Sequence, residues 1–430
     1  MPGEQARGHR LPSPWRRSPA GQPEEPARFR PAVFAALRHR NYRLYWIGAL
    51  VANTGDWMDQ VAFAWLMWEL TNSAGYLGLL AFFRGIPILF FTLFGGALAD
   101  RFERRRLMQV TQSFAMVLAL LLAALVYTGV VQVWQVLVIA ALRGVMMSVN
   151  LPTRQALLSD IVDREHLANA IALNSATRNV TRIVGGSLGG VLITLVGTAG
   201  VFLLNGLSFI ILIVALAAMR IPPLAHTGPP QSILRSIGDG FAYLRGHETL
   251  RTLMILALAP MLFGMPYISL LPVFADDVLG IGNEGYGLLL SCTGVGALIG
   301  ALTVASMGEY RRRGQLLLII MIWYGVMLIL FSRSTVPVLS YVLLFGVGAG
   351  QTGYLAFNMT LLQTHASDEM RGRVISFFYL NRGLVPLGTV AAGFAAQVFG
   401  VQPTVTAMGA MVVGLGLMTW WRAPRVREVE

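Results

Sequence analysis

Two carboxylates lie inside an apolar stretch close to the start of the chain, and they are the residues best suited to proton chemistry. Asp56 and Asp59 are three positions apart, so they share one face of a helix. A charge at the centre of a bilayer costs roughly 2.5–3.5 kcal/mol even on the lenient insertion scale, so such groups must face protein or water. Burial and a nearby cation can tune a carboxylate to bind and release protons. We therefore predict Asp56 and Asp59 as candidate proton-coupling residues.

Arginines inside other apolar stretches outnumber these two acids. Arg84 lies about as deep as the aspartates, so we expect it to pair with one of them, whereas Arg143 is expected in the inner half of its helix. A permanent Asp–Arg pair that holds the first two helices together is the alternative to proton transfer. The surplus arginines indicate either a cavity that attracts an anionic or polar substrate or structural arginines bound by carbonyl groups. The predicted intramembrane charges are Arg84, Arg143, Arg178, Arg182 and Arg382.

The elements that must position these charges are membrane-spanning helices. Apolar windows of about 20 residues, the length that crosses a bilayer, recur along the chain after Asn41. The fifth and eleventh windows carry arginine and polar residues, which makes them the hardest to delimit. We predict twelve transmembrane helices, at 42–68, 75–99, 107–127, 131–150, 168–196, 199–219, 250–275, 284–307, 314–332, 335–358, 372–399 and 402–421.

Arginine positions predict the orientation of these helices. All 33 basic residues are arginine; 27 fall in segments on the side of the N-terminus, one (Arg333) falls on the opposite side, and five lie within helices. Positive charge collects on the cytoplasmic side of short loops, so both termini are predicted to be cytoplasmic. The expected location is the inner (plasma) membrane of a bacterium, as a multi-pass protein.

The predicted helices form two groups of six. A polar connection with four prolines, at 220–249, separates a bundle at 42–219 from a bundle at 250–422. The segment 1–41 is rich in arginine and proline and is predicted to be a disordered cytoplasmic tail, and 423–430 forms a second tail.

The two halves also echo each other in sequence. Four identities within an eleven-residue window share one offset of 208 positions, which indicates internal duplication. Parallel repeats of this kind form two bundles around a central path. The matching residues are Asn150, Gln155, Ser159 and Asp160 in the first half and Asn358, Gln363, Ser367 and Asp368 in the second.

Composition excludes several other classes of protein. Hydrophobic residues form 55% of the chain and charged residues 13%, with a mean hydropathy of +0.62, which is typical of a membrane protein. The net charge of +12 follows from arginines in the connections, so no nucleic-acid partner is expected. One cysteine (Cys292) and no lysine exclude a disulfide framework and a lysine-dependent phosphate loop. Since no metal-ligand spacing and no serine–histidine pair is evident, we predict no metal, no cofactor and no enzyme activity.

The connection between the second and third predicted helices carries a dense mixture of charges. Residues 95–106 read Gly-Gly-Ala-Leu-Ala-Asp-Arg-Phe-Glu-Arg-Arg-Arg between two apolar runs. The charges stay hydrated only at a membrane face. Topology requires arginine but not Asp100, which could accept hydrogen bonds in one arrangement of the helices and lose them in another. A loop that only fixes topology is the alternative.

This loop resembles the signature Gly-x-x-x-Asp-Arg-x-x-Arg-Arg of the major facilitator superfamily, and the resemblance covers almost all of 41–422. The stretches 55–57, 69–73 and 152–158 are similar to the branch of drug:proton antiporters that includes macrolide-efflux and enterobactin-export proteins. The resemblance implies an all-α membrane protein with two pseudo-symmetric six-helix bundles that alternate in access. The residues that match the signature loop are Gly96, Asp100, Arg101, Arg104 and Arg105.

The resemblance also suggests roles for residues further along the chain. It implies a gate in which Arg371 or Arg373 is the partner of Asp100. Aromatic side chains could line a drug cavity, and Trp57 is the candidate. Glycines of the fifth predicted helix resemble the antiporter motif Gly-Pro-x-x-Gly-Gly, with glycine in place of proline, although close packing alone is an alternative role. These glycines are Gly185, Gly186, Gly189 and Gly190.

The favoured function is secondary active transport, namely proton-coupled export of a small amphipathic molecule such as a drug, a macrolide or a siderophore-like compound. The expected partners are this substrate, protons and membrane lipids, and the protein is expected to be a monomer. Uptake by symport and lysolipid flipping are alternatives on the same scaffold. A non-transporting membrane receptor or an enzyme is the alternative from another class.

Overall fold

The computed structural model describes residues 32–220, 243, 245–307, 312–367, 370, 372, 374–375, 377–378, 381 and 383–427. Throughout these ranges the secondary structure is helical, without strands. The N-terminal helices are η1 (Ala32–Arg38), α1 (Arg40–Thr71), α2 (Ala74–Arg101), α3 (Arg104–Tyr127), α4 (Val133–Ile161) and α5 (Arg164–Ala217). The C-terminal helices are α7 (Glu248–Ala259), η2 (Pro260–Gly264), α8 (Tyr267–Val273), η3 (Phe274–Val278), α9 (Gly282–Ser306), α10 (Arg313–Arg333), α11 (Pro337–His365), α13 (Val385–Phe399), α14 (Val401–Arg422) and α15 (Pro424–Arg427).

Nine of the described helical stretches are long and apolar enough to cross a membrane, and α13 is a shorter apolar helix. The all-α fold is confirmed, whereas the count of twelve is not. The 54-residue α5 covers two predicted spans, because Gly197 breaks it with φ 71° and ψ 172°, a conformation that residues with a Cβ rarely adopt. The 32-residue α1 is not among the nine, since Asp56 and Asp59 lie among its central turns.

Two helices continue well beyond their predicted ends. α4 was expected to end at residue 150 and continues to Ile161, and α11 was expected to end at 358 and continues to His365. In α4 the polar residues that suggested an end are satisfied by neighbouring helices: Asn150 Nδ2 donates to Thr111 Oγ1 of α3 at 3.3 Å. Polar side chains can therefore extend a helix at membrane depth when neighbours bind them.

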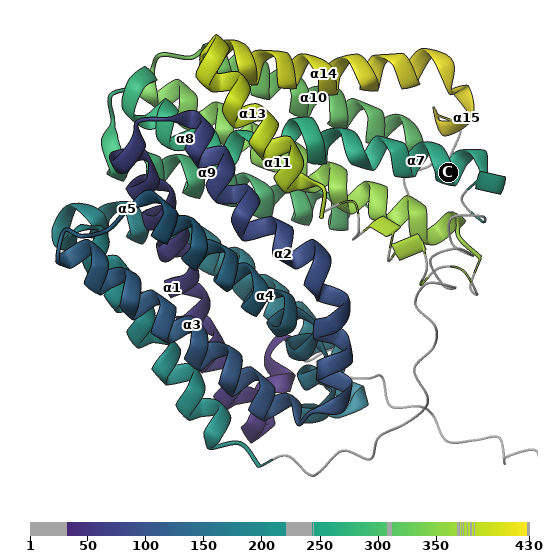
Figure 1. The fold of residues 1–430 in the computed structure, drawn as a ribbon. Coiled ribbons are helices and arrows are strands. Elements are labelled where there is room, and N and C mark those ends of the chain that lie inside the picture. Colours follow the sequence, from purple (N-terminus) through teal and green to yellow (C-terminus); the bar gives the residue numbers. More distant parts are fainter. Residues whose placement is uncertain are drawn as a thin grey trace, which may run out of the picture.

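The helices gather into two groups, which Figure 1 shows as a purple-to-teal set (α1–α5) and a green-to-yellow set (α7–α14). In the first group α1 packs on α5 and α2 packs on α4; in the second, α9 packs on α11 and α10 packs on α14. The groups meet along two seams, α5 with α9 and α2 with α13. The predicted bundle boundaries stay predictions, since most of 220–249 lies outside the described residues.

Glycines bring the backbones of the two groups together at both seams. A Cβ placed on Gly190 would lie 2.6 Å from the carbonyl oxygen of Asn283 at the α5–α9 seam. A Cβ placed on Gly393 would lie 2.7 Å from the carbonyl oxygen of Ala74 at the α2–α13 seam. Small residues allow this approach, and a larger side chain would force the helices apart. In the predicted duplication α2 corresponds to α9 and the first part of α5 corresponds to α13, so the two seams are pseudo-equivalent.

Candidate ion-pair and transport site

Arg143 of α4 binds both predicted carboxylates of α1. Its Nη2 donates to Asp56 Oδ1 at 3.2 Å, and its Nη1 forms an ion pair with Asp59 Oδ2. The three-residue spacing makes this possible, because it puts both acids on the same face of α1. A guanidinium group offers five N–H donors in a planar fork, so one arginine can serve two carboxylates.

The two acids differ sharply in exposure. The side chain of Asp59 is fully buried and that of Arg143 is 7% exposed, whereas Asp56 is 43% exposed. Removing one partner of a buried ion pair leaves an uncompensated charge, so Asp59 and Arg143 depend on each other. Asp56 is the carboxylate of the three-residue cluster that stays accessible.

The predicted pairing of Arg84 with the aspartates is wrong, because the ion pairs go to Arg143 instead. Arg84 Cζ lies 5.9 Å from the centroid of the Phe63 ring, and Arg143 Cζ lies 5.6 Å from the same centroid, within cation–π range. The prediction ended the fourth helix too early and so placed Arg143 in its inner half. Because α4 continues to Ile161, Arg143 lies nearer its Val133 end, at the depth of the aspartates.

A second arginine of α4, Arg154, also binds α1, although its sequence context had suggested a loop. Arg154 Nε donates to Tyr45 Oη at 2.5 Å, and its Nη1 donates to Asn53 Oδ1 at 3.1 Å. Arg154 follows Arg143 by about three helical turns, a spacing that puts both on one face of α4. That periodicity was the signal in the sequence, and the two arginines together join α1 to α4 at two depths.

Two arginines of α5 share a face but not an environment. Arg178 is exposed, and its Nη2 donates to Ser175 Oγ at 3.2 Å. Arg182, one turn later, has buried Nε and Nη2 atoms that have no hydrogen-bond partner within the described part of the chain. A Cβ placed on Gly294 of α9 would lie 3.5 Å from its Nε, so Arg182 lies where the two groups of helices meet. A buried guanidinium without a partner is costly, which makes Arg182 a candidate contact for a ligand.

The four glycines of the antiporter-like motif place α5 between α1 and α9. A Cβ on Gly185 would lie 2.7 Å from Trp57 Cβ, and Gly189 lies against Val61 and Met58 of α1 in the same way. Gly186 and Gly190 face α9 instead. Their neighbours on that helix are Asn283, Glu284, Gly287, Leu290 and Ser291. These glycines therefore pack helices on two sides of α5. Trp57 contacts α5 through its Cβ, and its role in a cavity stays a prediction.

The arginines of the signature loop bind the ends of neighbouring helices. Arg104 Nη1 lies 2.6 Å from Asp160 Oδ1, which ties the start of α3 to the end of α4. Arg105 Nη1 donates to the carbonyl oxygen of Met219 at 2.8 Å, just beyond α5. Arg101 is exposed. These contacts hold the ends of α3, α4 and α5 together, a positioning role that the sequence had not predicted for Arg104 and Arg105.

The close-packed glycine of the loop is not the one that matches the signature. A Cβ on Gly96 would have nothing within 4 Å, whereas one on Gly95 would overlap the carbonyl oxygen of Ser148 in α4. Gly95 therefore permits the approach of α2 to α4, and Gly96 does not take part in that packing.

Comparison with known proteins identifies the class to which this architecture belongs. The sequence pattern of the family described as transmembrane secretion effector matches residues 31–430. The chain belongs to this family. The Staphyloferrin A transporter of Staphylococcus aureus is 25% identical over 373 residues, which cover 85% of this chain and 92% of that protein. The multidrug efflux pump Tap of Mycobacterium tuberculosis is 29% identical over 393 residues, covering 89% and 93%. Macrolide efflux protein A of Streptococcus pyogenes is 22% identical over 409 residues, covering 91% and 98%.

Solved structures share the fold of this transporter. The crystal structure of a bacterial homolog of the human lysosomal transporter Spinster, in an inward-facing and unoccupied conformation, has a TM-score of 0.71 at 15% identity and covers 90% of this chain and 98% of its own. The D-xylose–proton symporter has a TM-score of 0.64 at 12% identity, with 92% and 98% covered. The chain is therefore a multi-pass transporter of the major facilitator type, and it is not an enzyme.

Several residues of the predicted gate lie beyond what the structure describes. The backbone of Asp100 belongs to the last turn of α2, but its side chain is outside the described part. Arg371, Arg373 and Arg382 also lie outside the described residues. The gating pair of this transporter therefore stays a prediction.

Proposed function

We propose that this transporter exports a small amphipathic molecule across the bacterial plasma membrane in exchange for protons, by alternating access. The names of three relatives, a staphyloferrin A transporter, a multidrug efflux pump and a macrolide efflux protein, support export of such compounds. The distribution of arginines supports a topology with both termini in the cytoplasm. The cluster of Asp56, Asp59 and Arg143 is the observation that carries proton coupling.

In this proposal the two acids of the cluster have different roles. Asp59 is fully buried and anchors Arg143, while Asp56 is 43% exposed and is held by a single 3.2 Å contact. A proton bound by Asp56 removes its charge and weakens its bond to Arg143, because charge-assisted hydrogen bonds are the stronger ones. Asp59 keeps the guanidinium in place meanwhile. Protonation of Asp56 alone can therefore loosen the contact between α1 and α4 at this position.

Alternating access needs contacts that form in one arrangement and break in the other. At the α5–α9 seam Ser187 Oγ donates to Ser291 Oγ at 2.6 Å, and Asn283 Nδ2 donates to the carbonyl oxygen of Gly190 at 3.1 Å. These bonds lie towards the Gly197 end of α5, away from the arginine-rich connections. In this proposal the two hydrogen bonds close the transport path at the Gly197 end of α5. Asp100, with Arg371 or Arg373, forms the gate at the opposite end.

The cargo site of the proposal is centred on Arg182. Its buried Nε and Nη2 atoms lack a hydrogen-bond partner among the residues that the structure describes, and they favour an anionic or polar group on the transported molecule, since such a group would supply those hydrogen bonds. The apolar remainder of an amphipathic molecule would contact the surrounding helices.

Substitution of Asp56, the proposed proton-binding residue, tests the proposal. Inverted membrane vesicles that are acidified inside should accumulate a radiolabelled macrolide through the wild-type protein. Asp56→Asn should lower this gradient-driven accumulation at least about tenfold, as expected when a titrating group is lost, and should retain exchange of labelled for unlabelled macrolide without a gradient. Glu69→Gln is the matched control, because Glu69 belongs to the same helix, is exposed and accepts a bond from Trp65 Nε1.

Two outcomes would contradict the proposal in different ways. Full gradient-driven accumulation by Asp56→Asn would reject Asp56 as the proton carrier. Accumulation that requires an alkaline rather than an acidic vesicle lumen, so that protons and macrolide enter together, would replace export by symport.

A further inference from the structure

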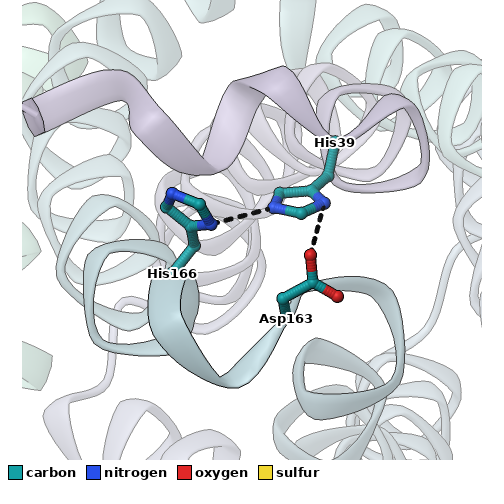
Figure 2. A group of neighbouring side chains, drawn as sticks. All are labelled: His39, Asp163 and His166. Atoms are coloured by element: carbon teal, nitrogen blue, oxygen red, sulfur yellow. Dashed lines mark hydrogen bonds and ion pairs between the residues drawn. The ribbon is translucent and has the colours of Figure 1, made fainter.

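A group of two histidines and one aspartate lies far from the charge cluster, at the junction of η1 and α1 with the connection between α4 and α5. Figure 2 shows His39, Asp163 and His166 turned toward one another from two separate stretches of chain. Each can offer one ligand atom, and these atoms all lie within 4.8 Å of one another. We propose that this group is a binding site for a divalent transition metal ion of the Zn²⁺ class.

The spacing of the two imidazoles suits such an ion. His39 Nε2 and His166 Nδ1 are 3.3 Å apart, and the rings meet edge to face at 63° with centroids 5.2 Å apart. Zinc–nitrogen bonds of about 2.0–2.1 Å in a tetrahedral site put two nitrogen ligands about 3.3 Å apart. A metal ion can therefore bind both nitrogens with little movement of either ring.

Asp163 supplies the third ligand. Its Oδ2 lies 3.8 Å from His39 Nδ1, the ring nitrogen that does not face His166, so the carboxylate must turn to reach an ion held between His39 Nε2 and His166 Nδ1. The side chain is 79% exposed, and one ligand atom of each residue lies within 4.8 Å of the others, which makes this rotation a short one. Water would complete the coordination, as in zinc sites with three protein ligands. Two imidazoles with one carboxylate favour zinc, cobalt or nickel over magnesium and calcium, which prefer oxygen ligands.

The surrounding contacts hold the two stretches of chain in place without a metal. Ala36 N donates to Asn169 Oδ1 at 3.0 Å, and Tyr42 Oη donates to the carbonyl oxygen of Ala170 at 3.0 Å. Asn41 Nδ2 donates to the carbonyl oxygen of Arg220 at 2.8 Å. The start of α1 is thus fixed against both ends of α5. Because the ligands are already held near one another, metal binding has a smaller entropic cost.

A route for the ion lies beside the ligands. A solvent-open hollow of about 430 Å³ is lined by His39, Arg40, Asn41, Ile161 and Arg220. Arg40 and Arg220 are positively charged and repel cations, so a cation such as Mg²⁺ that binds mainly through its charge is disfavoured here. The affinity must therefore come from the imidazoles, and the bound ion would clamp the N-terminus of α1 to that of α5.

Metal titration of the full-length protein tests this site. The protein is purified in detergent without a histidine tag, freed of metal with a chelator, and titrated with Co²⁺ while its visible absorption is followed, and then with Zn²⁺ in competition. We expect a site on the wild-type protein that Zn²⁺ occupies with displacement of Co²⁺. His166→Ala and His39→Ala should each weaken Zn²⁺ binding by at least about 10–100-fold, the usual loss when a residue that only supports a metal ligand is altered. His247→Ala is the matched control and should bind Zn²⁺ as the wild type does.

Stability provides a second measurement that does not depend on transport. Zn²⁺ should raise the Tm of the wild-type protein and of His247→Ala, Mg²⁺ should not, and His166→Gln should abolish the rise. If His39→Ala yields too little folded protein, His39→Gln replaces it in both assays. Absence of Zn²⁺ binding to the wild type, or equal weakening by His247→Ala and His166→Ala, would overturn the site.

Discussion

Within the described residues, the N-terminal helices bury an ion pair at positions whose equivalents in the C-terminal helices are neutral. In the first group the buried Asp59 of α1 binds Arg143 of α4. The residues 208 positions later, at the offset that relates Asn150 to Asn358, are Tyr267 and Gln351, and both are buried and uncharged. A repeated scaffold thus carries an acid–arginine pair in one copy and a tyrosine and a glutamine in the other.

We infer from this difference that the proton chemistry of the proposed mechanism belongs to the N-terminal half. A buried ion pair loses the hydration of both charges, so it is weak evidence for stability and is kept where it has another use. A neutral hydroxyl or amide in the same place costs less to bury. The N-terminal interior therefore has the groups that can change charge, and the C-terminal interior forms a pseudo-symmetric counterpart to it.

The largest expected effect comes from giving the N-terminal half the residue of its counterpart. Arg143→Gln introduces the side chain found at residue 351 and leaves Asp59 buried without its cation. Breaking a buried pair in this way costs about 3–5 kcal/mol, so we expect a large fall in Tm and in the yield of folded protein in detergent. Fluorescence-detected size-exclusion chromatography with a thermal ramp measures both.

A double substitution isolates the ion pair from other consequences of losing Arg143. Arg143→Gln combined with Asp59→Asn removes both charges and should restore most of the Tm, while transport stays absent. If the double variant is no more stable than Arg143→Gln alone, the loss of stability does not come from the unpaired charge of Asp59. The contrast between the two halves would then lose its physical basis.

The sequence predicted the two aspartates and their shared face but not their partner. Local spacing determines which side of α1 Asp56 and Asp59 occupy, and this part of the site needs no tertiary information. The partner depends on where α4 ends, and Asn150, Pro152 and Arg154 suggested an end that the structure does not have. Asn150 donates a hydrogen bond to α3 and Arg154 donates one to α1, and such bonds between distant segments cannot be read from the sequence of one helix.

The proposed metal site illustrates the same limit more strongly. His39 and His166 are 127 positions apart, so no ligand spacing marks them, and the sequence analysis predicted no metal. By contrast, the spacing of the α5 glycines indicated close helix packing as one of two roles, and a Cβ on any of the four would crowd α1 or α9. Residue spacing within one helix is predictable from the sequence, whereas contacts between segments that are distant in sequence are not.

A smaller effect is expected at the seam where the charged and neutral halves touch. Gly190→Val would place side-chain atoms where Asn283 O and the Cα of Gly287 lie, which forces α5 and α9 apart. Overpacking of this kind costs typically about 1–3 kcal/mol, so Tm should fall and transport should slow. Gly414→Val in α14 is the control, because a Cβ there would have nothing within 4 Å. Equal effects of the two variants would show that the seam tolerates separation.

Arg182 tests whether charge in the N-terminal half also selects the cargo. Arg182→Gln removes a cation whose buried Nε and Nη2 atoms have no hydrogen-bond partner among the described residues. It should lower export of an anionic amphipathic compound by about tenfold, the value of one charge-assisted hydrogen bond, or about 1.4 kcal/mol. Export of a cationic dye should be unchanged or faster. Arg178→Gln, one turn away and exposed, is the control. Parallel loss of anionic and cationic export would assign Arg182 to structure rather than to selection.

The smallest effect is expected at the neutral counterpart of Arg143. Gln351 is buried, and its Nε2 atom has no hydrogen-bond partner within the described part of the chain. Gln351→Met keeps the length of the side chain and removes the unsatisfied donor, so the change in stability should stay below about 1 kcal/mol in either direction. Vesicle transport and the thermal ramp used for Arg143→Gln measure it. If Gln351→Met stopped transport while Tm stayed unchanged, the amide would have to act on cargo or protons, and the C-terminal interior would be as active as the charged one.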